Sequence, residues 1–236
     1  TCALPICTMN GNIKLTKGTF TNSGTVSLPH NATNASIENF VNEATGILEI
    51  GLKTTDGVAG NATYSKLTTT NATFNSGSTI KVNVQGTDSN VTLLKDAVFN
   101  DVVSATGTLT VNGTLNVTDN SALLNFERVN NDATTIDLKA IQVQTVGQTI
   151  SGNNSNAQAA AGTLQTIVDN SASHPQMNGI ITALNGLSTN AQVERAVDST
   201  TPQTTTSSFD TARSVSELAN MAESLRESVT DFKLPE

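Results

Sequence analysis

Short runs of alternating apolar and polar residues recur through residues 46–140, and they constrain the fold more than any other feature of the sequence. Each run places apolar or β-branched side chains at every second position, which turns one face of a strand inward. The turn-forming pairs Asp56-Gly57 and Asn112-Gly113 separate some of these runs. The segment therefore predicts many short strands and no helix. The runs lie at 47–52, 79–84, 108–111, 114–117 and 135–140.

Strand length alone does not distinguish a sandwich, a barrel and a solenoid, so composition has to guide the choice. Aromatic residues make up 3% of the chain and tryptophan is absent, so a single wide core is poorly supplied with large side chains. A solenoid needs only a thin column of Val, Ile, Leu and Ala, because each coil covers the exposed face of the next. We therefore expect a mainly β protein built as a solenoid.

The spacing of apolar residues changes after a polar linker at 144–156, from two to between three and four, which indicates helices. Ser173 and Thr189 begin segments with the spacing of a capping box. We expect four parts: a non-native or disordered N-terminus at 1–9, a β region at 10–145, a polar linker with short helices at 146–204, and a last helix at 205–236. Two helix faces are Ala160, Ala161, Leu164, Ile167 and Val168, and Met177, Ile180, Ile181, Leu184 and Leu187.

The charge and the cysteine content of the chain limit the kinds of partner that we expect it to bind. The net charge is −8 with only 14% charged residues and no Lys/Arg cluster, which argues against nucleic acid as a partner. No apolar run is long enough to span a bilayer. The two cysteines, Cys2 and Cys7, suit a small extracellular disulfide loop, and no neighbouring residues complete a metal site. Residues 1–6 also match the translated end of a common sequencing adapter, so whether the cysteines are native stays open.

No catalytic constellation is visible in the sequence. His30 and His174 are far apart and lie outside any recognisable triad, and no nucleophile elbow, phosphate loop, dinucleotide fingerprint or zinc motif occurs. We therefore expect no enzyme, and no catalytic, cofactor-binding or metal-binding residues. Four aspartates are interpreted as solvated turn corners instead of a glycan-cleaving pair: Asp88, Asp96, Asp101 and Asp119. Three phenylalanines are expected in the core, with a carbohydrate-stacking platform as the alternative: Phe74, Phe99 and Phe126.

The order of the segments resembles the passenger-domain end of bacterial autotransporters. Gly46-Ile-Leu-Glu-Ile50, Tyr64-Ser-Lys-Leu-Thr68 and residues 71–82 are similar to a strand pattern of that family, and residues 91–95 and 131–138 are similar to its following strands. Residues 181–188 and 191–202 resemble its helical linker. The resemblance implies a right-handed parallel β-helix followed by an α-helical linker segment whose last helix threads the pore of an outer-membrane β-barrel.

The resemblance also implies a function. The C-terminal end of such a passenger leaves the barrel first and folds outside the cell, and the burial of successive coils then makes backsliding unfavourable. We expect a non-enzymatic monomer at the surface of a Gram-negative bacterium, whose partners are its own or a downstream outer-membrane β-barrel and a host or cell-surface ligand. The positions expected to carry this role by packing are Ile80, Val82, Val84, Leu93, Leu124, Phe126, Ile136 and Leu138.

Two further interpretations remain open. A polysaccharide-degrading enzyme or phage tailspike of β-helical fold would require acidic and aromatic residues clustered on one face. A β-rich adhesin with a trimeric helical stalk would differ from the first interpretation in its oligomeric state. The sequence identifies neither a ligand nor the activity of any upstream passenger region, and it does not show whether the passenger is cleaved.

Overall fold

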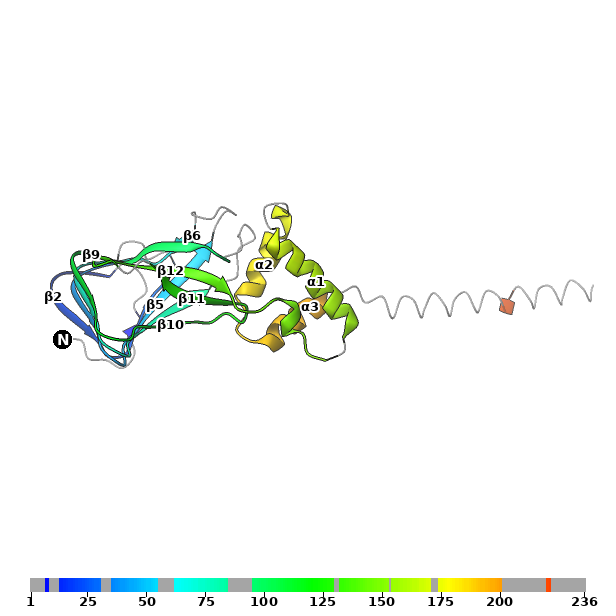
Figure 1. Ribbon diagram of the computed structural model, residues 1–236, viewed down its shortest axis with the longest axis horizontal. Helices are drawn as coiled ribbons and strands as arrows, with labels where there is room; N and C mark the ends of the chain where they lie inside the picture. The colour runs from blue at the N-terminus through cyan, green and yellow to red at the C-terminus, as the bar shows by residue number, and fades with distance from the viewer. Residues whose placement is uncertain are drawn as a thin grey trace, which may run out of the picture. The chain divides into compact units, whose positions relative to one another are not determined.

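The computed structural model describes residues 7–8, 13–30, 35–54, 62–84, 95–129, 132–152, 154–170, 174–200 and 220–221. The chain divides into two compact units, Thr1–Asp198 and Ser199–Glu236. The first unit contains all the strands and the three α-helices described below, except for the last two residues of the third helix. Its strands form two six-stranded sheets (Figure 1).

The first sheet is parallel along its main path, in the order β1-β3-β5-β8-β10, and β6 is added antiparallel to β5. The second sheet has the order β11-β12-β9-β7-β4-β2, in which β2, β4, β7 and β9 are parallel and β12 and β11 are antiparallel. The strands of the first sheet are β1 (Cys7–Thr8), β3 (Thr25–Leu28), β5 (Ile47–Thr54), β6 (Ala62–Tyr64), β8 (Thr79–Val84) and β10 (Asn116–Asp119). Those of the second sheet are β2 (Lys14–Asn22), β4 (Ala35–Asn42), β7 (Leu67–Phe74), β9 (Val98–Val111), β11 (Leu124–Val129) and β12 (Thr135–Gln142).

The chain passes repeatedly from the second sheet to the first, so β2, β4, β7 and β9 are followed by β3, β5, β8 and β10. Because alternate residues of each strand point inward, the two sheets share one apolar core. Aromatic side chains of neighbouring strands pack on one another in this core. Phe20 lies parallel to Phe40 at a centroid distance of 6.1 Å, and Phe40 meets the edge of Phe74 at 5.8 Å.

Buried asparagines join the two sheets at one corner. Asn42 is fully buried, and its Oδ1 accepts a hydrogen bond from Nδ2 of Asn22 at 2.7 Å. Nδ2 of Asn42 donates to the carbonyl oxygen of Gly46 at 3.0 Å. Gly46 has no room for a side chain, because a Cβ atom there would collide with the Asn22 carbonyl oxygen and with Asn42 Oδ1. The corner therefore needs both a small residue and an amide side chain.

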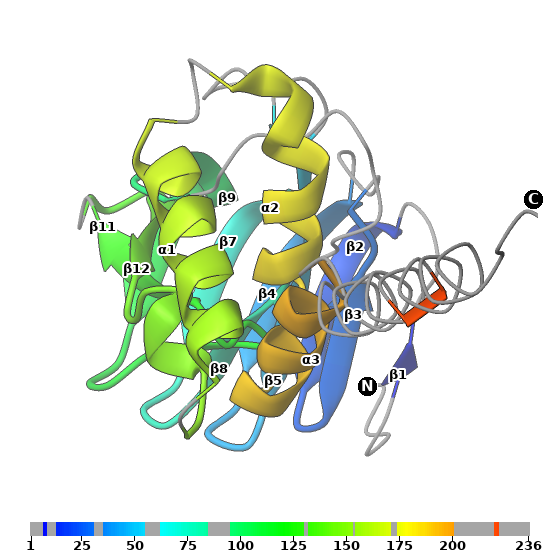
Figure 2. The same ribbon diagram turned by 90° about the vertical axis from the view of Figure 1, so that its right-hand side faces the viewer.

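Three α-helices follow the strands and pack around a second apolar core (Figure 2). Leu123 and Leu124 mark the boundary between the two cores, since Leu123 belongs to the helical core and Leu124 to the sheet core. Thr189 and Gln192 form the expected capping box, in which each side chain bonds the backbone N–H of the other residue. The helical elements are η1 (Gly147–Thr149), α1 (Ser155–Asp169), η3 (Pro175–Met177), α2 (Asn178–Asn185) and α3 (Asn190–Thr200).

The prediction of a right-handed parallel β-helix followed by an α-helical linker segment is wrong. The chain folds as mixed α/β structure with two sheets and three helices. The alternating run at 135–140 forms β12, which pairs antiparallel with both β9 and β11 instead of extending a parallel stack. Alternation specifies which face of a strand is buried but not the direction in which the strand pairs, so the sequence pattern fitted both arrangements.

Most of the packing positions predicted from the sequence lie in the sheet core. Leu93 lies outside the described residues, as do Cys2, Ser173 and nearly all of the last helix expected at 205–236. Val146 and Ile150, in the segment expected to be a polar linker, are buried in the helical core. None of the described helices is both long and apolar enough to cross a membrane. The buried positions are Ile80, Val82, Val84, Leu124, Phe126, Ile136 and Leu138.

Candidate functional site

A groove with a volume of about 290 Å³ lies across β2, β4, β7 and β9 of the second sheet. The pairing register shifts at this place, between Leu15 and Thr19 of β2 and between Thr69 and Asn71 of β7. Such irregularities bend a strand and re-aim its side chains. Five exposed residues with side-chain hydroxyl groups line the groove: Thr16, Ser36, Thr68, Thr70 and Thr106.

The groove also has an apolar part and one acidic side chain. Leu15 and Ile37 lie among the hydroxyl groups, and Ile37 is 1% exposed. Glu38 is the acidic residue of the lining, and its Oε2 accepts a hydrogen bond from the backbone N–H of Gly18 at 2.5 Å. Among the described residues, no lysine or arginine is part of the lining, although the exposed Lys14 pairs with Ser36 in the register of β2 and β4. The groove is therefore polar but carries little charge.

Asparagine side chains hold the strands together beside the groove. Nδ2 of Asn71 donates to Oδ1 of Asn39 at 2.9 Å, and Oδ1 of Asn71 accepts from the backbone N–H of Thr108 at 3.1 Å. Nδ2 of Asn39 donates to the carbonyl oxygen of Gly18 at 3.3 Å. The bonds run across β2, β4, β7 and β9, so they fix the spacing of the strands that line the groove.

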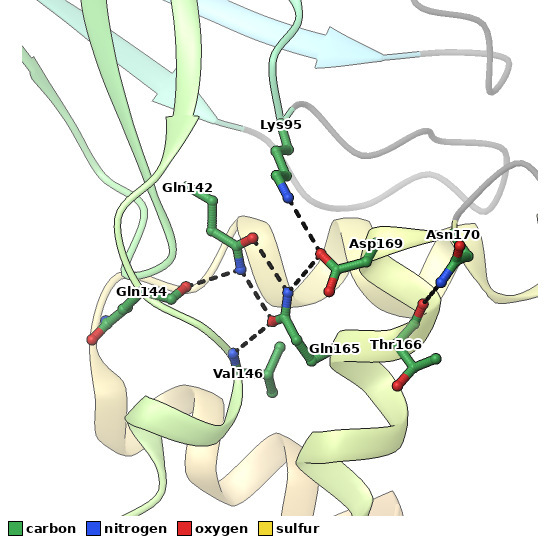
Figure 3. Close-up of polar contacts among 8 residues, drawn as sticks. All are labelled: Lys95, Gln142, Gln144, Val146, Gln165, Thr166, Asp169 and Asn170. Atoms are coloured by element: carbon green, nitrogen blue, oxygen red, sulfur yellow. Dashed lines mark hydrogen bonds and ion pairs between the residues drawn. The ribbon is translucent and has the colours of Figure 1, made fainter.

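A second cluster of polar side chains joins the helices to the end of the second sheet (Figure 3). Gln142 of β12 and Gln165 of α1 bond each other in both directions, at 3.1 and 3.3 Å. Oε1 of Gln165 also accepts from the backbone N–H of Val146 at 3.1 Å. Nζ of Lys95 lies 3.2 Å from Oδ1 of Asp169, which accepts a further bond from Gln165. The amides are partly buried and saturated with partners, so this junction is structural.

The residues singled out for chemistry in the sequence do not come together. The described residues contain no group of three or more His, Cys, Asp or Glu that could hold a metal ion. Asp96 lies in a turn with φ 63°, whereas Asp101 lies inside β9 with φ 57°. The backbone N–H of Asp101 donates to Oδ1 of Asp137 at 2.7 Å. Asp88 lies outside the described residues.

The three phenylalanines are confirmed as core residues, because Phe74, Phe99 and Phe126 are at most 3% exposed. Phe99 and Phe126 lie near each other with ring centroids 6.1 Å apart, and Tyr64 meets the edge of Phe99 at 5.4 Å. These rings fill the space between the sheets and cannot offer a face to a sugar. The alternative of a carbohydrate-stacking platform at these residues is therefore wrong.

Three carboxylates have shifted pKa values. Burial raises the pKa of Asp119, although the backbone N–H of Ser121 offsets part of this effect. Partial burial also acts to raise the pKa of Glu49, but hydrogen bonds from Lys81 and Ser27 outweigh it, and the net pKa is lowered. Hydrogen bonds from the Thr135 hydroxyl and from the backbone N–H groups of Thr134 and Thr135 lower the pKa of the exposed Asp132 to about 2. Each shift has a local structural cause.

No protein-family model matches this chain, and comparisons with curated proteins and with solved structures likewise give no match. The evidence for a functional site therefore comes from the geometry of the chain itself. Sequence reasoning missed the groove, although the run Thr68-Thr69-Thr70 carries a signal for it. Three successive hydroxyl residues within a strand place such side chains on both faces and leave the outer face polar.

Proposed function

We propose that this chain is a non-enzymatic passenger segment of an autotransporter, exposed at the surface of a Gram-negative bacterium, whose stepwise folding assists its own secretion. The observation that carries the proposal is the side-by-side pairing of parallel strands from successive segments of the chain, in which asparagine side chains of neighbouring strands bond one another. The amides of Asn71 and Asn120 bond asparagines 32 and 37 positions earlier in the chain. Each strand thus offers an edge to an earlier strand of the same sheet.

The order of the elements suits folding that begins at the C-terminal end. The hairpin of β11 and β12 and the capped helices depend on contacts between segments close in sequence, which form fast. The parallel strands β9, β7, β4 and β2 can then be added one at a time to an existing edge. Each addition buries apolar surface, which opposes movement of the chain back into a pore.

The partners in this proposal follow from the same resemblance. The pore belongs to an outer-membrane β-barrel that is not part of the described residues, and the segment expected to thread it is 205–236. The chain acts as a monomer and does not bind nucleic acid, in keeping with the net charge of −8 of all its residues. Sedimentation equilibrium tests this part, because a trimeric stalk would give three times the monomer mass.

The decisive experiment places the full chain between a signal peptide and an autotransporter barrel and measures its accessibility to protease on intact cells. Leu138→Asp on β12 and Val26→Asp on β3 both introduce a charge at positions that are 1% exposed. We expect Leu138→Asp to reduce surface display at least tenfold and Val26→Asp to reduce it much less, because β12 folds first. Equal reductions by the two variants, or no display of the unaltered chain, would contradict the proposal.

A further inference from the structure

We propose that the groove across β2, β4, β7 and β9 binds an uncharged glycan. This inference goes beyond the proposed function, because it concerns a binding activity of the folded chain and is independent of how the chain reaches its location. The groove is about 290 Å³ in volume, just below the range of about 300–1,000 Å³ typical of small-molecule sites. It can therefore hold a short segment of a longer chain.

Some hydroxyl groups of the groove already form hydrogen bonds within the protein, and others do not. The hydroxyl of Thr69 donates to the Ser104 carbonyl oxygen at 3.3 Å, and that of Thr106 donates to the Thr69 carbonyl oxygen at 3.4 Å. In contrast, the hydroxyls of Thr16, Ser36, Thr68 and Thr70 form no hydrogen bond within the part of the chain that the structure describes. These four groups are free to bond a ligand.

The chemistry of these groups selects the ligand. A hydroxyl both donates and accepts hydrogen bonds, so an array of them matches a ligand that carries many hydroxyls of its own. Leu15, which is partly exposed, supplies apolar surface for the C–H face of a sugar ring. Hydroxyl-bearing side chains and apolar contacts together fit a carbohydrate better than a purely apolar or a peptide ligand.

The charge of the groove favours an uncharged ligand. Glu38 is the charged side chain among the described lining residues and is held by the Gly18 N–H, whereas the exposed Lys14, which pairs with Ser36, lies outside the lining. Bringing an anionic ligand next to this carboxylate would cost free energy through repulsion of like charges. The site therefore discriminates against acidic polysaccharides.

The hydroxyl groups of the groove are also held in place before a ligand binds. Ser36 pairs with Thr68 in the register of β4 and β7, and Thr68 pairs with Ser104 of β9, so the hydroxyls of adjacent parallel strands form a row. The amide of Asn71 ties β7 to both of its neighbours beside the groove. Groups that are held on rigid strands lose little freedom when a ligand binds, which favours affinity.

Titration calorimetry of the purified full chain tests the proposal. The probes are neutral hexasaccharides built from glucose, galactose, mannose or N-acetylglucosamine, with a heparin hexasaccharide as the anionic probe. We expect at least one neutral probe to bind and the heparin probe not to bind. Binding of the heparin probe alone, or of none of the neutral probes, would overturn the proposal.

A double variant, T68V/T70V, locates the site. Valine keeps the branched shape and the strand preference of threonine but removes the hydroxyl, so we expect the affinity for the neutral probe to fall at least tenfold while thermal unfolding is unchanged. The matched control is Thr108→Val, which alters an exposed threonine of β9 outside the groove. Unchanged affinity in the double variant, or an equal loss in the control, would place binding elsewhere and refute the assignment.

Discussion

The two sheets and the three helices belong to one compact unit but are held together by different kinds of contact. In the sheets, side chains pack between strands that are distant in sequence, as Phe20, Phe40 and Phe74 do. In the helices, buried residues recur every three or four positions along each segment. The sheet core therefore depends on every strand being present, whereas the helical core is built largely from local segments.

Few contacts join the sheet core to the helical core. Leu123 and Leu124 are neighbours that belong to different cores, and the polar junction around Gln142 and Gln165 bridges the two. Cores that share few contacts can open separately. We therefore expect the sheets and the helices to behave as two cooperative units that the junction couples.

The largest effect is expected from Phe40→Ala. Phe40 is 1% exposed and lies between Phe20 and Phe74, so the truncation leaves a cavity in the middle of the stack and costs about 3–5 kcal/mol. Hydrogen exchange should show lost protection in strands of both sheets while α1 to α3 keep theirs. Leu184→Ala, at a position of α2 that is 3% exposed, is the matched variant and should show the reverse pattern. Loss of protection throughout the unit in both variants would mean that the two cores are a single cooperative unit.

A smaller effect is expected from Asn42→Ala. The Asn42 amide bonds Asn22 and the Gly46 carbonyl oxygen at a fully buried corner. These two groups keep second partners, the Ile47 carbonyl oxygen and the Thr79 N–H respectively, so the loss of the Asn42 amide removes two hydrogen bonds at a cost of about 1–3 kcal/mol. Urea unfolding measures this cost. Asn39→Ala is the control, because the Asn39 amide bonds Asn71 and Gly18 at an exposed place. Equal destabilisation by the two variants would show that the burial of Asn42 does not raise the cost of losing its amide.

The alternation in the sequence predicted the buried faces well but not the pairing of the strands. Ile80, Val82 and Val84 are buried as expected, because a period of two fixes which side chains point inward. The run that forms β12 has the same pattern, yet it pairs antiparallel with β9. The direction of pairing depends on the turn before a strand and on the rest of the sheet, which the pattern of the run does not record.

The groove and the junction were harder to foresee for a related reason. The groove lies where the register shifts between Thr69 and Asn71, and a register shift is a relation between two strands. Gln142 and Gln165 are 23 residues apart and share no pattern. The change of apolar period from two to between three and four did place the helices, because that signal is local.

The junction gives the next smaller prediction. Gln165→Ala removes the paired amide and leaves the backbone N–H of Val146 without its acceptor, so we expect a loss of about 1 kcal/mol. Hydrogen exchange should become faster in η1 and α1 and stay unchanged in β4 and β7. Thr163→Ala is the control, since the Thr163 hydroxyl is exposed and bonds a carbonyl of its own helix. A uniform change across both regions would show that Gln165 contributes to global stability and not to coupling.

The smallest effect concerns Asp132, which lies in the turn between β11 and β12. The pKa of Asp132 is lowered from 3.8 to about 2, chiefly by the Thr135 hydroxyl and by backbone N–H groups. A lowered pKa means that the carboxylate stabilises the folded state above about pH 4, and that this contribution is lost as the pH falls towards 2. Asp132→Asn should therefore lessen the decline in stability between pH 4 and pH 2 without changing the helices.

Thr135→Val tests whether the hydrogen bond from the Thr135 hydroxyl lowers the pKa of Asp132. The Thr135 hydroxyl lies 2.7 Å from Oδ2 of Asp132, and without it the pKa of Asp132 should rise towards 3.8, which an NMR titration of the carboxyl carbon measures. Because Asp132 bonds the first residue of β12, the acid-induced loss should appear first in hydrogen exchange of β11 and β12. If protection falls first in the helices, or if the titration of Asp132 is the same in both proteins, this turn does not control the end of the second sheet.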